Sequence, residues 1–189
     1  MPHYMFSLEE YKVAVEFFAS SHSNFDIKSE GDDCARVVFT NLFLNAKQRI
    51  RMVAHTLKNE VVDSKEYQDA LDSFLAREDA KLEIIIHHLP MITKEGEVLN
   101  LYRRLRFNPA YDAGRIEIKA AGRDRFFIGD KPVNFCVADG MMYRLENDIE
   151  KRTAICNFGN KRRAEELESA FGHVFDSINE TVNLKELFA

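Results

Sequence analysis

Few cysteines, no long apolar run and no excess of positive charge limit what this sequence can encode. Its three cysteines are an odd number, have mostly apolar neighbours and lack the close spacing of a zinc knuckle. We therefore expect buried free thiols instead of a disulfide or metal framework. No apolar stretch is long enough to span a bilayer, and residues 1–19 carry three glutamates, which argues against a secretory leader. These features predict a soluble, cytoplasmic protein without membrane insertion.

The charge balance also limits the partners. The 26 lysines and arginines face 31 aspartates and glutamates, which gives a formal net charge of -5. Such a chain lacks the broad positive field that binds nucleic acid regardless of sequence, so any nucleic-acid contact would be local. At 189 residues and 46% hydrophobic content, the chain can bury one core but hardly two.

The hydrophobic periodicity alternates between helices and strands. The expected helices cover residues 7–19, 34–46, 64–77, 97–106 and 161–179. The expected strands cover residues 49–54, 82–86, 115–120, 125–128, 132–138, 141–145 and 153–158. Helices between strands favour parallel neighbours, which need a crossover connection. The pattern predicts an α/β fold with a central mixed β-sheet and helices on both faces.

Local signals set some of the boundaries. Ser7 and Glu10 form a capping box at the start of the first helix, and Ser64 is a candidate N-cap. Asp139-Gly140 is a strong hairpin signal, because both central residues of that tight turn need a positive φ. The polar stretch 20–33 indicates a loop. We therefore divide the chain into an N-terminal helix and linker (1–33) and the main domain (34–189).

Two stretches resemble the phospholipase D-like superfamily. Residues 46–86, AKQRIRMVAHTLKNEVVDSKEYQDALDSFLAREDAKLEIII, resemble the strand, loop, helix and strand that open the family's repeat. Residues 132–160, PVNFCVADGMMYRLENDIEKRTAICNFGN, resemble the region that carries the family motif His-x-Lys-x4-Asp. The length of the chain leaves room for a single repeat. The resemblance implies a phospholipase D-like single repeat.

The aligned motif lacks two of its three residues. Placing Asp139 on the motif aspartate puts Pro132 at the histidine and Asn134 at the lysine, while Asn157 falls at a later family asparagine. In active family members the histidine attacks phosphorus, a second histidine protonates the leaving oxygen, and the lysines hold the phosphate charge. Proline offers no nucleophile and asparagine no charge. The resemblance therefore implies a pseudo-enzyme without cofactor, whose degenerate ligand-binding pocket is formed by Asn134, Asp139, Asn157 and His55.

Two groups of residues that contain histidine could form a catalytic or metal site. His55, Lys58 and Asp63 form His-x2-Lys-x4-Asp, but side chains three apart on an extended strand point to opposite faces, so the first two should not converge. His55 keeps some interest because ligands of α/β sheets gather at the carboxyl ends of strands. His87 and His88 end near the same edge, but adjacent histidines point oppositely and chelate poorly. We expect no metal site.

The most basic stretch is 102–131, which holds eight cationic and four acidic residues, a local charge of +4. Its candidate phosphate- or partner-binding residues are Arg103, Arg104, Arg106, Arg123 and Arg125. Arginines among aromatic residues suit nucleic acid. A solvated face or a protein interface explains them as well, and we favour that alternative.

Three functions follow from these patterns. The first is a non-catalytic domain that acts as a protein-interaction or sensing module, as a homodimer or with an unidentified protein partner. The second is a nucleic-acid or phosphate-ligand binding protein that uses the degenerate pocket and the stretch from Arg103 to Arg125. The third is a divergent phosphodiesterase or nuclease subunit. Because two of the three motif residues are missing, we favour the first function.

Overall fold

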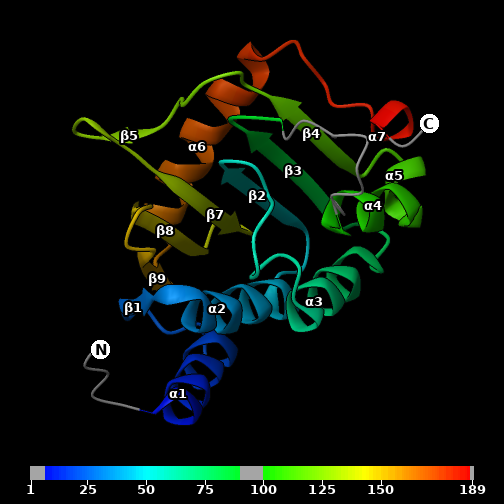
Figure 1. Ribbon diagram of the computed structural model, residues 1–189. Helices are drawn as coiled ribbons and strands as arrows, with labels where there is room; N and C mark the ends of the chain where they lie inside the picture. The colour runs from blue at the N-terminus through cyan, green and yellow to red at the C-terminus, as the bar shows by residue number, and fades with distance from the viewer. Residues whose placement is uncertain (1–6, 90–99, 188–189) are drawn as a thin grey trace.

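The computed structural model describes residues 7–89 and 100–187. Seven strands form one sheet in the order β1-β9-β8-β7-β2-β3-β4, and β5 and β6 form a separate hairpin (Figure 1). The strands are β1 (Ile27–Glu30), β2 (Arg49–Ala54), β3 (Lys81–Ile86), β4 (Ile116–Ala120), β5 (Phe127–Ile128), β6 (Lys131–Pro132), β7 (Asn134–Ala138), β8 (Met142–Asp148) and β9 (Thr153–Asn157). The helices are α1 (Leu8–Ser20), α2 (Gly31–Asn45), α3 (Lys65–Leu75), α4 (Asn100–Phe107), α5 (Pro109–Asp112), α6 (Lys161–Ser177) and α7 (Leu184–Leu187).

The sheet is mixed, as predicted. Strands β2, β3 and β4 are parallel neighbours, whereas β7, β8, β9 and β1 continue the sheet in antiparallel pairs. β2 is the junction, because it pairs in parallel with β3 and antiparallel with β7. The carboxyl ends of the three parallel strands therefore lie at one edge of the sheet, next to the start of β7.

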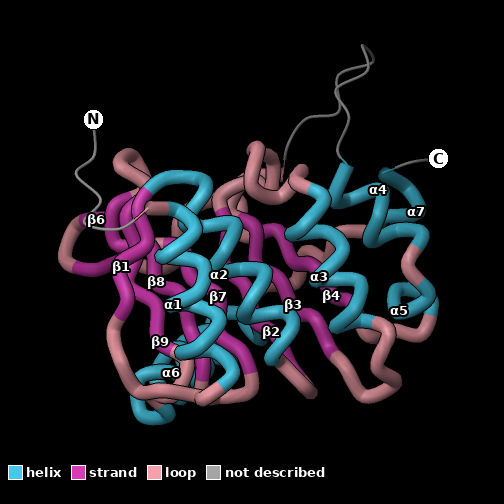
Figure 2. Tube along the Cα trace, turned by 90° about the horizontal axis from the view of Figure 1, so that it is seen from below, coloured by secondary structure: helices cyan, strands magenta, loops and turns pink. Residues whose placement is uncertain are grey.

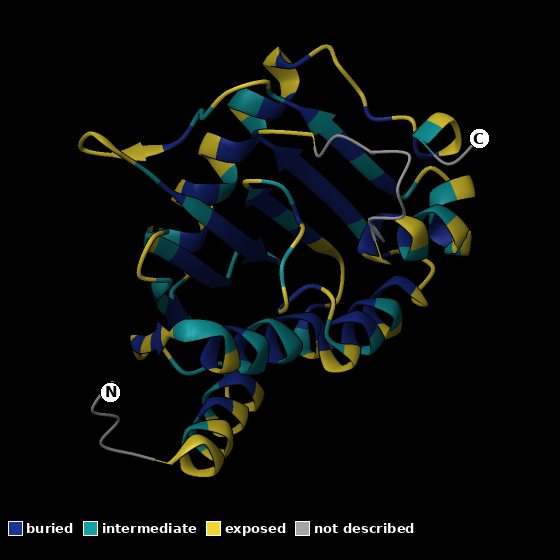
Figure 3. Cartoon of the chain, in the orientation of Figure 1, coloured by how far each residue is buried: buried dark blue, intermediate teal, exposed yellow. Residues whose placement is uncertain are grey.

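Helices cover both faces of this sheet. α1, α2 and α3 lie on one face and α6 on the other (Figures 1 and 2). Alternation along β2 supplies both cores: Met52 belongs to the cluster under α2 and α3, and Val53 to the cluster under α6 with Phe171. The strands are mostly buried between these layers, and exposed residues concentrate on the outer helix faces and loops (Figure 3). Among the helices that the structure describes, none has the length and apolar character needed to cross a bilayer.

The predicted boundary signals are confirmed. Ser7 and Glu10 form the reciprocal capping box of α1, and Ser64 accepts a hydrogen bond from the Tyr67 backbone at the start of α3. Asp139 and Gly140 have φ angles of 52° and 61°, as the tight turn between β7 and β8 requires. Cys34, Cys136 and Cys156 are free and buried, as expected.

Three predictions need correction or restriction. The expected loop over 20–33 is wrong for Ile27–Glu30, which forms edge strand β1 against β9, and for 31–33, which form the first turn of α2. In β1 only Ile27 and Ser29 face the interior, which is too short a pattern to recognise in the sequence. Pro132 lies outside the main sheet, in the β5-β6 hairpin. A proline lacks the N–H that a central strand donates, which suits this placement. Of the expected helix 97–106, residues 97–99 lie outside the described residues.

Candidate functional site

A cavity of about 310 Å³ lies where β2 ends and β7 begins. α2 and α3 contribute to one wall, the loop after β2 forms another, and strands β7 and β8 contribute residues from the antiparallel half of the sheet. Most of the lining is apolar in type and includes Phe39, Met52 and Tyr67. Its charged side chains, its histidine and the one amide from strand β7 are Asp32, His55, Lys58, Asn134, Arg144, Glu146 and Arg152.

Arg144 is the most deeply placed of these charges. The residue is only 3% exposed, and its guanidinium lies 5.0 Å from the centre of the Phe39 ring. Its Nη2 is 3.6 Å from Glu146 Oε1, and the Asn134 Nδ2 donates to Glu146 Oε2 at 2.9 Å. Within the described ranges, Arg144 Nε and Asn134 Oδ1 are buried without a hydrogen-bond partner. Hydrogen-bonding capacity thus remains unused at this end of the cavity.

The charges around the cavity favour an anion slightly. Three cationic residues face two carboxylates, which leaves a balance of +1. Arg152 forms an ion pair with Asp32, and Arg144 and Lys58 are the other two cationic residues that line the cavity. An arginine partly desolvated beside an apolar ring is suited to hold a carboxylate or phosphate oxygen.

The structure contradicts the geometric argument against His55 and Lys58. The chain leaves the extended conformation after Ala54, and Leu57 adopts a left-handed φ of 54°. His55 and Lys58 consequently both line the cavity, although Asp63 does not. A left-handed conformation costs a non-glycine residue about 1 kcal/mol or more, and such strain is often found at ligand sites.

Asp139 and Asn157 do not line the cavity, unlike Asn134 and His55. Asp139 lies at the other end of β7, where its carboxylate accepts the backbone N–H groups of Lys47, Gln48 and Arg49 at 2.6, 3.0 and 2.8 Å. The Asn157 amide donates to Asn24 Oδ1 at 3.0 Å and Asp26 Oδ1 at 2.8 Å, and its oxygen accepts the Gly159 N–H. The structure therefore brings two of the four predicted pocket residues together and gives the other two contacts that fix loops.

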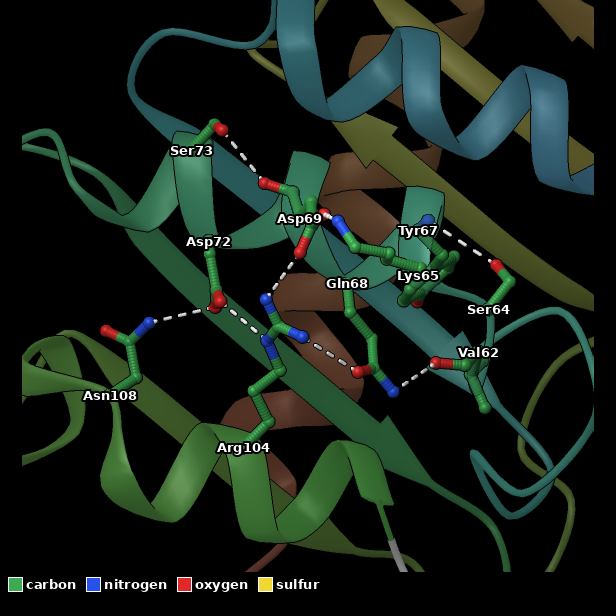
Figure 4. Close-up of polar contacts among 10 residues, drawn as sticks. All are labelled: Val62, Ser64, Lys65, Tyr67, Gln68, Asp69, Asp72, Ser73, Arg104 and Asn108. Carbon is green, nitrogen blue, oxygen red and sulfur yellow. Dashed lines mark hydrogen bonds and ion pairs between the residues drawn. The ribbon is translucent and has the colours of Figure 1, made fainter.

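The basic stretch does not form one surface. In α4, Arg104 donates to Asp72 Oδ2 at 2.6 Å, to Asp69 Oδ1 at 2.7 Å and to Gln68 Oε1 at 3.0 Å (Figure 4). These bonds join α4 to α3 and occupy the guanidinium. Arg123 and Arg125 belong to the segment between β4 and β5, which lies on the other side of the molecule from α4 (Figure 1).

A second polar cluster lies where the parallel strands end. Ligand atoms of His55, His88 and Asp124 lie within 4.8 Å of one another. The first two follow β2 and β3, and the His88 N–H donates to the His55 carbonyl at 2.9 Å, which places their ring centroids 4.6 Å apart. His87 is fully buried, and its Nδ1 lies 3.0 Å from Asp124 Oδ1, so both adjacent histidines approach the same carboxylate. Burial lowers the pKa of His87, against the opposing effect of Asp124.

The sequence analysis did not predict this cluster or the position of Arg144 in the cavity. It considered His87 and His88 as a pair of metal ligands. In the structure, His88 instead lies close to His55, which follows the neighbouring parallel strand, and to Asp124, which follows β4. A usable signal was present, because the carboxyl ends of adjacent parallel strands meet at one sheet edge. Arg144 left no comparable signal, since a charge within an apolar run does not show which partner it meets.

Comparisons with known proteins support the fold. No family model and no curated protein matches the chain. Among solved structures, Nuc from Salmonella typhimurium, a phospholipase D family member, superimposes with a TM-score of 0.55 at 14% identity over 84% of this chain and 98% of its own. Phosphatidylserine synthase from Haemophilus influenzae Rd KW20 gives 0.54 at 14% identity, over 87% of this chain and 41% of its own.

A DNA-binding protein shares the same fold. TrmBL2, reported as an archaeal chromatin protein with a novel mode of DNA binding, gives a TM-score of 0.55 at 14% identity. The match covers 92% of this chain but only 62% of TrmBL2, so this chain spans less than two thirds of TrmBL2 and of the synthase. The fold of the chain is phospholipase D-like, a mixed α/β sheet covered on both faces, as the resemblance implied.

Proposed function

We propose that this chain is a non-catalytic phospholipase D-like domain that senses a phosphate-bearing ligand by binding it in the cavity. The observation that carries the proposal is the buried guanidinium of Arg144 in a cavity also lined by Lys58 and Asn134. Asn134 is the residue that the resemblance places at the family lysine. A phosphate here would gain charge-assisted hydrogen bonds from Arg144 and Lys58 and a neutral donor or acceptor from Asn134.

The same site argues against family-type chemistry. Pro132, at the histidine position of the resemblance, lies in the β5-β6 hairpin and does not line the cavity. Of the histidines, His55 alone is among the lining residues of the described chain, whereas the family mechanism uses two.

The buried free thiols are compatible with a reducing compartment, so we place the protein in the cytoplasm.

We expect phosphate binding to depend on the cavity cations. Lys58→Ala removes an exposed charge and should weaken the binding of inorganic pyrophosphate or a short single-stranded oligonucleotide roughly tenfold, while Arg144→Lys should weaken it tenfold or more, because a charged hydrogen bond contributes about 1.5–3 kcal/mol. Isothermal titration calorimetry in the presence of EDTA measures both. Lys185→Ala, which removes an exposed lysine on distant α7, is the control.

The salt dependence separates a single phosphate site from a nucleic-acid surface. One phosphate held in the cavity should give a slope of log K against log salt of about -0.7, since each neutralised phosphate of a single strand contributes that much. A slope several times steeper, unaffected by Lys58→Ala, would place oligonucleotide binding on another surface. Absence of any pyrophosphate binding by the folded wild-type protein would contradict the proposal.

A second proposed role is self-association, which an exposed apolar patch favours. We define the α1 patch as Val13, Phe17, Phe18 and Phe25, in which Phe18 stacks on Phe25 with centroids 5.1 Å apart. Val13, Phe17 and Phe25 are 65%, 63% and 58% exposed. A contiguous apolar patch on a charged surface is typical of protein interfaces. A second copy of the chain, paired through α1, would cover it.

Light scattering should therefore give about twice the chain mass of 21.9 kDa at micromolar concentration. Phe17→Glu places a charge in the patch and should shift the protein to the monomer. Phe127→Glu, on the exposed β5-β6 hairpin, should leave the dimer intact. A monomeric wild-type protein across this range would exclude self-association, and a Phe17→Glu dimer would exclude α1 as its surface.

A further inference from the structure

Three side chains from separate segments converge beside the cavity. His55 follows β2, His88 follows β3, and Asp124 follows β4, so each comes from the carboxyl end of a different parallel strand. Their ligand atoms all lie within 4.8 Å of one another. Among the described residues, no other set of three histidine, cysteine or acidic side chains lies this close together.

The donor set suits one class of cation. Two imidazole nitrogens and one carboxylate oxygen match zinc and its neighbours in the transition series, while magnesium and calcium prefer sites made of oxygen alone. In a tetrahedral zinc site with bonds of about 2.0 Å, ligand atoms lie about 3.3 Å apart. His55 and His88 are exposed and lie just beyond their strands, so we expect rotation of their side chains to bring the ligand atoms to this spacing.

A buried group behind the cluster supplies an independent argument. His87 is fully buried, and neither ring nitrogen makes an aligned hydrogen bond within the described residues. Its Nδ1 nevertheless lies 3.0 Å from Asp124 Oδ1, which is likewise without an aligned partner. Buried polar groups are normally satisfied. A carboxylate that binds a metal is commonly oriented by such a neighbour, so His87 is suited to position Asp124.

We propose that His55, His88 and Asp124 bind one divalent transition-metal ion of the zinc class, with His87 positioning the carboxylate. Three protein ligands leave a fourth position free for water or a ligand atom. Because His55 also lines the cavity, the metal site and the proposed phosphate site share this residue, and that position would be open to a ligand from the cavity. A phosphate oxygen that occupies it would couple the two sites, although neither proposal depends on the other.

Cobalt serves as a visible probe of the site. The purified full chain is treated with chelator, dialysed and titrated with Co²⁺ in phosphate-free buffer, followed by competition with Zn²⁺. We expect one ion per chain and the intense visible absorption of low-symmetry cobalt, without thiolate charge-transfer bands, because the three cysteines are buried elsewhere. His88→Ala and Asp124→Ala should each weaken binding at least 100-fold, more than the 10–100-fold typical of outer-shell changes.

His173→Ala is the matched control, since His173 is exposed on α6 and outside the cluster. The affinity of this variant for Co²⁺ should equal that of the wild-type protein. Thermal unfolding of each variant without metal checks that it is folded. Because His88 is exposed, His88→Ala is the variant expected to disturb the fold least. Wild-type protein without saturable cobalt or zinc binding, or folded His88→Ala with wild-type affinity, would overturn the metal site. The phosphate titrations contain EDTA, so the two proposals fail separately.

Discussion

Asp139→Ala should lower the free energy of unfolding by about 2–4 kcal/mol, because one carboxylate holds three backbone N–H groups at the entry to β2. These bonds join residues about 90 positions apart and fix where the central strand begins. Their partly exposed setting places each nearer 1 kcal/mol than the upper range for charged acceptors. Alanine also loses the tolerance of aspartate for the left-handed φ of 52° at this turn.

Urea denaturation monitored by circular dichroism measures this loss. Asp139→Asn should fall between wild type and Asp139→Ala, since its amide oxygen can still accept from Gln48 and Arg49 while its NH₂ faces the Lys47 N–H. Asp79→Ala, in an exposed turn after α3, should change stability by less than about 0.5 kcal/mol. An Asp139→Ala change equally small would show that the three bonds do not stabilise the fold.

The elements that sequence reasoning predicted best are those with long apolar periods or specific turn chemistry. α6 and α3 present continuous buried faces at helical spacing, and β3 is an apolar run long enough to be recognised. The tight turn followed from the Asp139-Gly140 pair alone. β1 escaped because it has four residues, of which one buried position is a serine. Such a strand is defined by its neighbour β9 and not by its own sequence.

The site was less predictable than the fold, for reasons that lie in single residues. The convergence of His55 and Lys58 depends on the left-handed Leu57, a conformation that leucine rarely adopts and no sequence pattern indicates. In the sequence, Arg104 looked free to bind a ligand, because its partners Asp69 and Asp72 lie more than 30 residues earlier in the chain. Asn134 was identified through the resemblance, and the structure places it at the cavity.

The second large effect is an absence of phosphodiester cleavage. Enzymes accelerate such reactions by about 10⁶-fold or more, and the family mechanism derives that acceleration from a histidine nucleophile, a histidine acid and lysines that hold the charge. Here Pro132 offers no nucleophile and Asn134 no charge at the aligned positions. A dimer would bring two copies of the same deficient motif together. We therefore expect binding in the cavity without covalent chemistry.

The most direct test measures turnover on the protein that binds pyrophosphate. The purified chain is incubated with a chromogenic phosphodiester and with single- and double-stranded DNA and RNA, in EDTA and in zinc, beside an active phospholipase D family enzyme as positive control. We expect no product above the buffer blank in either condition. Turnover by the wild-type chain that disappears in His55→Ala would contradict it and would identify His55 as a catalytic residue.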